Sequence, residues 1–136
     1  MKVGKLKSVL LVDDDETTNF LNKFFIKQID STIEIHSVVN GLEALEFLRN
    51  ADNNQLDFPC LLILDTNMPV MNGWDFLNSY EEYFDAKFKE NITIVMITAL
   101  ENEETVRRTL ADPNVRDIAQ KPLSDRIFRK MFTKHF

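Results

Sequence analysis

The amino-acid sequence predicts an α/β fold in which helices cover both faces of a parallel sheet. Five short segments have the composition of strands: 9–12, 60–64, 92–97 and 115–119 are apolar runs, and 32–39 partly alternates apolar with polar residues. A segment with helical periodicity separates each strand from the next along the chain. Strands that alternate with helices pair in parallel through right-handed crossovers, so we expect five strands and five helices.

The strand segments differ in how much of their surface they are expected to bury. The runs 9–12, 60–64 and 92–97 show no alternation, which is typical of strands covered on both faces. Segment 32–39 is expected at a sheet edge or with one face exposed, because polar residues alternate along part of it. The polar, turn-rich stretch 50–59 is interpreted as an enlarged surface loop.

Each predicted helix rests on apolar residues that recur about every 3.6 positions. The first helix follows the acidic cluster 13–16, the second follows Asn40-Gly41, the fourth spans 103–111, and the fifth spans 124–136 after a cap-like "PLSD". The apolar faces are Phe20, Leu21, Phe24, Phe25 and Ile29; Leu42, Leu45 and Leu48; Trp74, Leu77, Tyr80 and Phe84, flanked by Phe76 and Tyr83; Val106 and Leu110; and Ile127, Phe128, Met131 and Phe132.

Length and composition predict one compact domain over residues 1–136. Hydrophobic residues make up 44% of the chain, and the net charge of −6 argues against nucleic acid and anionic lipid as partners. A single cysteine, Cys60, forms no internal disulfide and is interpreted as a small buried residue, and no membrane-spanning or signal segment is evident. We therefore expect a cytoplasmic protein, and we assign no chemistry to His36 or His135.

Polar residues follow four of the predicted strands. The first strand is followed by Asp13 and Asp14, the third ends at Asp65, the fourth at Thr98, and the fifth at Gln120-Lys121. Ligands of open α/β sheets bind at the carboxyl ends of the strands, where these groups would meet. Clustered carboxylates favour a magnesium ion, which together with Lys121 would neutralise a phosphoryl group on Asp65 as nucleophile, with the Thr98 hydroxyl bonded to one phosphoryl oxygen.

Each of these residues also has an ordinary structural interpretation. The acidic cluster 13–16 could cap the following helix, and Asp15 and Glu16 are expected to do only that. Asp65 alone could be a turn residue, and Asn72-Gly73 an ordinary helix entry. Thr98 and Lys121 alone would be a capping hydroxyl and a surface charge. Their joint occurrence at four strand ends favours a shared site.

Four segments in order and spacing strengthen that interpretation: "LLVDDDE", "LILDTNMPVMNGWDFL", "IVMITA" and "AQKPLS". They resemble the motifs of the response regulator receiver domain, the CheY-like phosphoacceptor of two-component signalling. The resemblance covers nearly the whole chain and implies strand order 2-1-3-4-5 in a flavodoxin-like sheet, with a cis bond before Pro122. It assigns roles to six residues: Asp65 as phosphoacceptor, Asp13 and Asp14 as the metal-binding acidic pair, Asn67 as donor of a backbone carbonyl to the metal, Thr98 as the switch hydroxyl, and Lys121 as the phosphate-binding lysine.

Two positions depart from the pattern that the resemblance brings with it. Many receivers carry an aromatic residue three positions before the lysine, where this chain has Ile118, so an aromatic rotamer switch is not expected. Leu100 stands two positions after Thr98, where many relatives have a polar residue, and it would alter water access to the phosphoryl group. Ala99 keeps the usual small residue beside the site.

The function expected from these residues is that of a stand-alone response regulator. It would take a phosphoryl group from a sensor histidine kinase or a histidine phosphotransfer protein, using magnesium, and change its affinity for a downstream protein through the surface 99–111. An aspartate-nucleophile phosphatase is an alternative, but such enzymes usually carry a second aspartate where this chain has Asn67. A binding module that is never phosphorylated is the third interpretation, and the presence of Asp65, Thr98 and Lys121 speaks against it.

Overall fold

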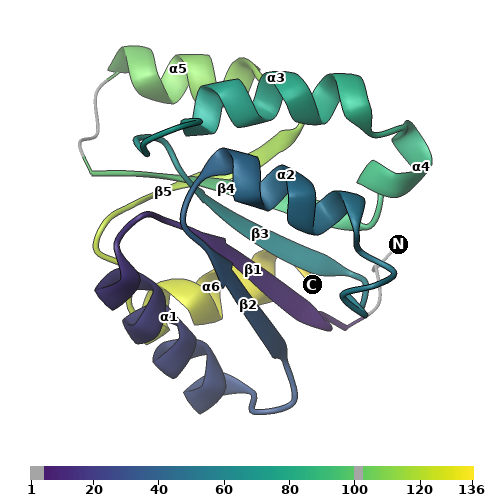
Figure 1. Cartoon of the computed structure of the whole chain (residues 1–136). Coiled ribbons are helices and arrows are strands. Elements are labelled where there is room, and N and C mark those ends of the chain that lie inside the picture. The colour runs from purple at the N-terminus through teal and green to yellow at the C-terminus, as the bar shows by residue number, and fades with distance from the viewer. Residues whose placement is uncertain (1–4, 100–102) are drawn as a thin grey trace.

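The computed structural model describes residues 5–99 and 103–136, and these form one five-stranded parallel sheet with flanking helices (Figure 1). The elements follow in the order β1 (Ser8–Val12), α1 (Glu16–Ile29), β2 (Glu34–Val38), α2 (Gly41–Arg49), β3 (Cys60–Asp65), α3 (Gly73–Tyr83), α4 (Ala86–Lys89), β4 (Ile92–Thr98), α5 (Glu103–Ala111), β5 (Val115–Gln120) and α6 (Asp125–His135).

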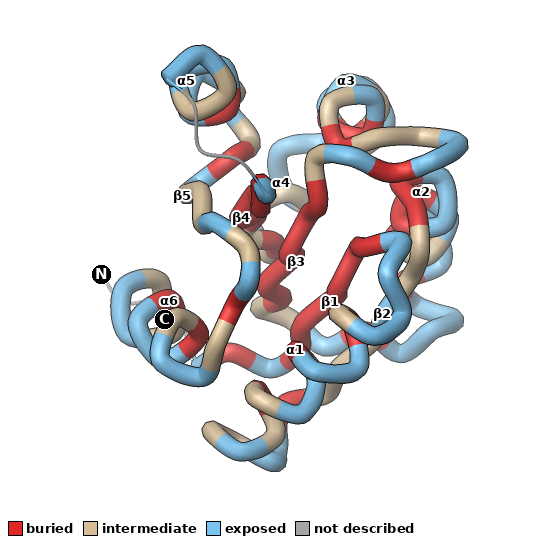
Figure 2. Tube along the Cα trace, turned by 90° about the vertical axis from the view of Figure 1, so that its left-hand side faces the viewer, coloured by how far each residue is buried: buried red, intermediate tan, exposed pale blue. Residues whose placement is uncertain are grey.

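The strand order is β2-β1-β3-β4-β5, all parallel, and the predicted order 2-1-3-4-5 is confirmed. β1, β3 and β4 lie inside the sheet, and almost every residue in them is buried, as their unbroken apolar composition predicts. β2 is an edge strand of intermediate burial, in agreement with its partial alternation. Figure 2 shows the buried strands at the centre of the molecule.

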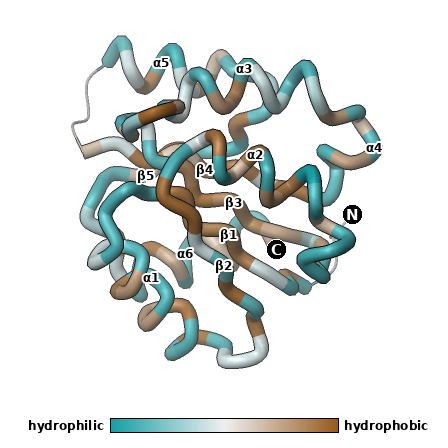
Figure 3. Tube along the Cα trace, in the orientation of Figure 1, coloured by the Kyte–Doolittle hydropathy of each residue, from teal (hydrophilic) through white to brown (hydrophobic). Residues whose placement is uncertain are grey.

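Two apolar cores lie on opposite faces of the sheet. α2 and α3 cover one face, where Leu45, Leu48, Phe76 and Tyr80 are almost completely buried. α1 and α6 cover the other face (Figure 1). The hydropathy along the chain follows this arrangement, with hydrophobic segments gathered at the strands (Figure 3).

The predicted apolar face of the first helix is wrong for three of its five residues. Phe20, Leu21 and Phe24 are 70%, 46% and 53% exposed, whereas the buried residues of α1 are Asn19, Asn22 and Ile26. Phe25 and Ile29 do pack against the core as partly buried residues. The side of the helix that carries Asn19 and Asn22 faces the sheet, and there Asn19 donates a hydrogen bond to the backbone of Asp13.

Smaller differences concern α2, α4 and α5. Leu42, predicted on the apolar face of α2, is 42% exposed. α4 is a four-residue helix that the sequence analysis did not predict; Asp85 caps it, with its carboxylate accepting from Phe88 N–H at 2.9 Å. In α5 the buried residue is Thr109, and Leu110 is 52% exposed.

The stretch 50–59 is the predicted irregular connection, but two of its side chains pack into the core and its backbone accepts a hydrogen bond from β1. Ala51 and Leu56 are each only 7% exposed, and the Ser8 hydroxyl donates to Asp57 O at 2.6 Å. The predicted cis bond before Pro122 is present, and Phe58–Pro59 is also cis. Within residues 5–99 and 103–136, no helix combines the length and apolarity needed to cross a membrane.

Candidate functional site

The strand register brings Asp13 and Asp65 side by side. Val12 pairs with Leu64 across β1 and β3, so the next residue of each chain segment is an aspartate at the same level of the sheet. Asp65 itself pairs with Ile97 of β4, directly before Thr98. Asp13 is 4% exposed and Asp65 is 5% exposed, so two carboxylates are buried together at the carboxyl end of the sheet.

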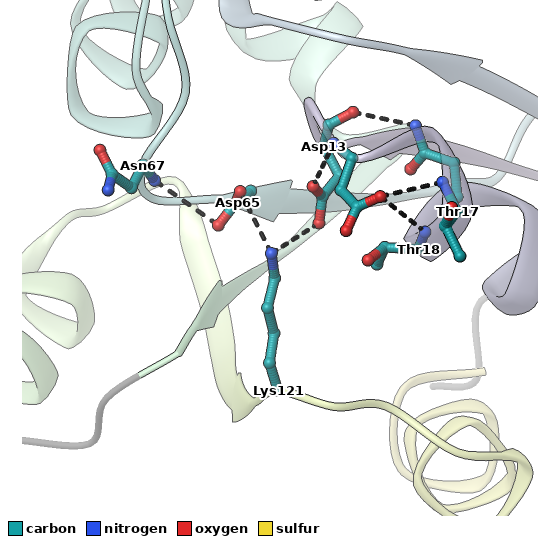
Figure 4. Close-up of polar contacts among 8 residues, drawn as sticks. Asp13, Thr17, Thr18, Asp65, Asn67 and Lys121 are labelled. Atoms are coloured by element: carbon teal, nitrogen blue, oxygen red, sulfur yellow. Dashed lines mark hydrogen bonds and ion pairs between the residues drawn. The ribbon is translucent and has the colours of Figure 1, made fainter.

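Lys121, which directly follows the edge strand β5, contacts both carboxylates. Its Nζ lies 2.8 Å from Asp13 Oδ2 and 3.3 Å from Asp65 Oδ2 (Figure 4). Its backbone N–H donates to Thr98 O at 2.9 Å, which fixes the start of the segment after β5. Burial by itself lowers the pKa of Lys121, but the hydrogen bond to Asp13 and the nearby charge of Asp65 outweigh it, so that the pKa is raised and the ammonium stays charged.

The environment of Asp65 disfavours its charged form. Burial is the main cause of its raised pKa, and repulsion by Asp13 adds to it, while the Lys121 ammonium acts in the opposite direction. Asn67 N–H also faces this carboxylate, 3.5 Å from Oδ1. A cation bound beside Asp13 and Asp65 would offset this repulsion and favour the charged form of Asp65.

Three carboxylates converge at this point. One oxygen each from Asp13, Asp14 and Asp65 lies within 4.8 Å of the others, which is close enough to share one ion. Asp14 is exposed, so a metal ion bound here could keep several water ligands. Hard oxygen donors, net negative charge and one open side are the donor set that Mg²⁺ prefers, so these residues fit such an ion.

The loop after β3 is held close to the site by a glycine. Gly73 N–H donates to Thr66 O at 3.1 Å, and a Cβ at position 73 would lie 2.6 Å from Asp65 O, a separation that real Cβ atoms do not adopt. Asn72 caps α3 by accepting from Asp75 N–H at 2.9 Å. The predicted helix entry Asn72-Gly73 thus also brings α3 against the backbone of Asp65.

Thr98 ends β4 and is buried, 6% exposed. It lines a small cavity of about 40 Å³ together with Val106 of α5 and Ile118 of β5. Ile118 stands at the position that is aromatic in many receivers, and its aliphatic side chain is half-buried against this cavity. Leu100 lies outside the described residues.

The structure brings Asp13, Asp14, Asp65 and Lys121 into one pocket, with Asn67 beside it. Asp15 acts as the helix cap that was expected, because its carboxylate accepts from Thr17 N–H at 2.9 Å and Thr18 N–H at 3.4 Å. The sequence analysis missed Asn19, whose Nδ2 donates to Asp13 O at 2.9 Å. Because Asn19 lies outside the apolar spacing of α1, hydrophobic periodicity gives no signal for it.

A parallel sheet in the order 2-1-3-4-5 with an acidic pocket and a lysine at its carboxyl end defines a signalling domain of the CheY-like fold. The response regulator receiver domain family matches residues 9–133. The chain belongs to this family.

Individual relatives agree with this assignment. The chemotaxis protein CheY1 of Helicobacter pylori is 31% identical over 123 residues, which are 90% of this chain and 90% of that protein. A probable C4-dicarboxylate response regulator DctR of Priestia megaterium is 29% identical over 106 residues, 78% of this chain. The solved structure of a two-component response regulator from Cytophaga hutchinsonii matches with a TM-score of 0.84 and 27% identity, covering 96% of this chain and 97% of that one.

The curated relatives differ in length. The chain spans 42% of the length of the Priestia protein and between 10% and 51% of three others that it matches. The family membership therefore describes the receiver, and the activity of a whole protein is a separate question.

Proposed function

We propose that this receiver accepts a phosphoryl group from a phosphohistidine donor onto Asp65 and signals through protein contacts that depend on the phosphorylation. The observation that carries the proposal is the contact of one ammonium with two buried carboxylates, 2.8 and 3.3 Å away, beside a third carboxylate. Such a pocket holds more negative charge than Lys121 can neutralise. It is suited to a metal ion and to a nucleophilic carboxylate.

The transfer is a direct displacement at phosphorus. An oxygen of the Asp65 carboxylate forms the new O–P bond while the P–N bond of the phosphohistidine breaks, and the bonding electron pair leaves with the imidazole nitrogen. Magnesium, held by the carboxylates of Asp13, Asp14 and Asp65 and the backbone carbonyl of Asn67, would supply neutralisation of the phosphoryl oxygens.

The protein's own groups then bind the product. Lys121 exchanges its contact with Asp65 for one with a phosphoryl oxygen, while its contact with Asp13 keeps it in place. The Thr98 hydroxyl donates to a second phosphoryl oxygen. Water attack at phosphorus later returns Asp65 to its free form, so the signal is reversible.

The output is a shift of the surface that follows Thr98. A change at this residue reaches Val106 and Ile118 through the small cavity that the three residues line. α5 is a suitable element to move, because Thr109 is its one fully buried residue. The histidine kinase or histidine phosphotransfer protein and the downstream target would be met in the cytoplasm.

Intact mass spectrometry tests the proposal. The chain is incubated with acetyl phosphate and MgCl₂, and the expected result is a gain of one phosphoryl group that is absent in Asp65→Asn and suppressed by EDTA. Asp75→Asn is a matched control, because it removes an exposed carboxylate of α3 without touching the pocket. No gain in wild type, or an equal gain in Asp65→Asn, would contradict it.

A further inference from the structure

The amide of Asn19 makes one hydrogen bond and leaves one atom unpaired. Asn19 lies in the first turns of α1 and is 6% exposed. Its Nδ2 donates to Asp13 O at 2.9 Å, whereas its Oδ1 is the buried side-chain atom that has no partner among the described residues. Turning the amide around would set two acceptors against each other, so this orientation is the one that the hydrogen bonding allows.

Net stability gives little reason for an asparagine at this position. A leucine would remove the unpaired Oδ1, but it would also leave Asp13 O without the donor that Asn19 provides, so the two effects largely cancel. Ile26, two turns further along α1, shows that a fully buried aliphatic residue can meet the sheet from this helix. The Nδ2–H bond to Asp13 is therefore the contribution that distinguishes Asn19 from a leucine.

That hydrogen bond fixes one particular peptide plane. The carbonyl of Asp13 and the N–H of Asp14 belong to the same rigid unit, so holding the oxygen also sets the direction in which Asp14 leaves the strand. The rest of Asp13 is already fixed: its N–H donates to Val38 O at 3.2 Å, and its Oδ1 accepts from Asp15 N–H at 2.9 Å.

Asp14 depends on this plane more than its neighbours do. Across the described residues, no hydrogen bond or ion pair holds its carboxylate, whereas Asp13 and Asp65 both contact Lys121. Even so, an oxygen of Asp14 lies within 4.8 Å of oxygens of the other two aspartates. With no such contact, the direction of the Asp14 carboxylate depends on its backbone conformation and on its own side-chain rotamer.

We propose that Asn19 is a positioning residue, which holds the Asp13–Asp14 peptide so that the Asp14 carboxylate faces the acidic pocket before a divalent cation arrives. The inference rests on the proposed function for the identity of the cation, Mg²⁺. Without the Asn19 bond, Asp14 samples directions away from the pocket, and binding the ion must then restrict it. Asp65 and Lys121, which perform the chemistry, keep their own contacts.

Asn19→Leu tests the proposal, with Mg²⁺ binding measured by isothermal titration calorimetry in the absence of any phosphodonor. We expect the Kd for Mg²⁺ to rise by roughly 10-fold, the size of effect seen when groups that orient a metal ligand are removed. The melting temperature is expected to change little, since the unpaired Oδ1 is lost but Asp13 O also loses its donor. Asn22→Leu is the matched control: Asn22 is 5% exposed in the same helix, its side chain makes no hydrogen bond to Asp13 or Asp14 among the described residues, and its replacement should leave the Kd unchanged.

A double-mutant cycle with Asp14→Ala separates positioning from a general disturbance. If Asn19 acts through Asp14, Asn19→Leu changes the Kd in wild type but not in the Asp14→Ala background. Equal effects in both backgrounds, or a wild-type Kd in Asn19→Leu, would overturn the inference. In the metal-free protein, the amide resonance of Asp14 is also expected to shift in Asn19→Leu, and an unchanged resonance would count equally against it.

The two proposals fail separately in these experiments. A chain that binds Mg²⁺ with the expected dependence on Asn19 but gains no phosphoryl group would refute the proposed function alone. A chain that is phosphorylated on Asp65 but binds Mg²⁺ equally well in wild type and Asn19→Leu would refute the positioning role alone.

Discussion

Replacing Lys121 by methionine removes the ammonium that bridges Asp13 and Asp65 while keeping most of the volume of the side chain. Its Nζ lies 2.8 and 3.3 Å from the two carboxylates. Each pair has a Coulomb energy of about 5–6 kcal/mol at an effective dielectric constant near 20, before the cost of burying the charges is counted. Removing one partner of a buried ion pair typically costs about 3–5 kcal/mol.

The exposure of Lys121 reduces this cost. Because 24% of its side chain is exposed, we expect a loss of about 2–3 kcal/mol in the free energy of unfolding. For a domain of this size, that loss lowers the melting temperature by about 6–12 °C. Thermal unfolding of the metal-free protein, followed by circular dichroism, measures it.

Magnesium binding should restore part of the stability that Lys121→Met loses. The ammonium and a divalent cation repel each other within one pocket, so its removal strengthens Mg²⁺ binding. We expect MgCl₂ to raise the melting temperature of Lys121→Met by more than that of wild type.

Lys134→Met is the matched control for the loss of one positive charge. Lys134 Nζ lies 3.0 Å from Asp117 Oδ2, but its side chain is 62% exposed, so the expected loss is below about 1 kcal/mol. A Lys121→Met variant that loses no more stability than Lys134→Met, or that gains less from MgCl₂ than wild type, would refute the reasoning.

Three further predictions concern neighbouring parts of the site. Because the pKa of Asp65 is raised, the native state binds this proton more tightly than the unfolded chain does, and the group lowers stability as the pH rises through the ordinary carboxyl range. Metal-free Asp65→Asn should therefore have a higher melting temperature than wild type at neutral pH. The difference in melting temperature should disappear in acid. Gly73→Ala sets a Cβ 2.6 Å from Asp65 O and should lower the unfolding free energy by about 1–3 kcal/mol in urea titrations and slow phosphorylation by acetyl phosphate. Arg108→Ala removes a guanidinium centred 4.1 Å from the ring of Trp74, the single tryptophan, and should reduce the change in tryptophan fluorescence that a beryllofluoride phosphoryl mimic causes in wild type. An unchanged pH dependence, wild-type stability, or an undiminished fluorescence response would contradict the respective prediction.

The sheet could be predicted from the sequence because its inner strands are unambiguous. β1, β3 and β4 have no polar alternation, and they proved to be buried on both faces. The polar residues at their ends mark the carboxyl edge of the sheet, and the parallel register then brings Asp13 beside Asp65. Composition and position along the chain were enough for this part.

The orientation of α1 could not be predicted in the same way. Its strongest apolar pattern includes Phe20 and Phe24, yet the sheet is met by Asn19 and Asn22. This orientation includes a hydrogen bond from Asn19 to the backbone of Asp13, which exists only once strand and helix are placed together. Hydrophobic periodicity takes no account of such a bond.

The short helix α4 and the buried face of α5 could not be predicted from hydrophobic periodicity either. α4 has four residues and so gives no periodic signal, and its start depends on the carboxylate of Asp85. In α5 the buried position is Thr109, whose hydroxyl donates to Thr105 O at 2.7 Å. Because its own helix satisfies this hydroxyl, a threonine can be buried where the pattern predicted Leu110.

Borohydride reduction of the phosphorylated chain tests most directly whether Asp65 is the acceptor. Reduction converts an aspartyl phosphate to homoserine, and peptide mass spectrometry then identifies the residue that carried the phosphoryl group. We expect homoserine at position 65 alone, dependent on MgCl₂ during phosphorylation. Homoserine at Asp13 or Asp14, or a phosphoryl group on another side chain, would contradict it.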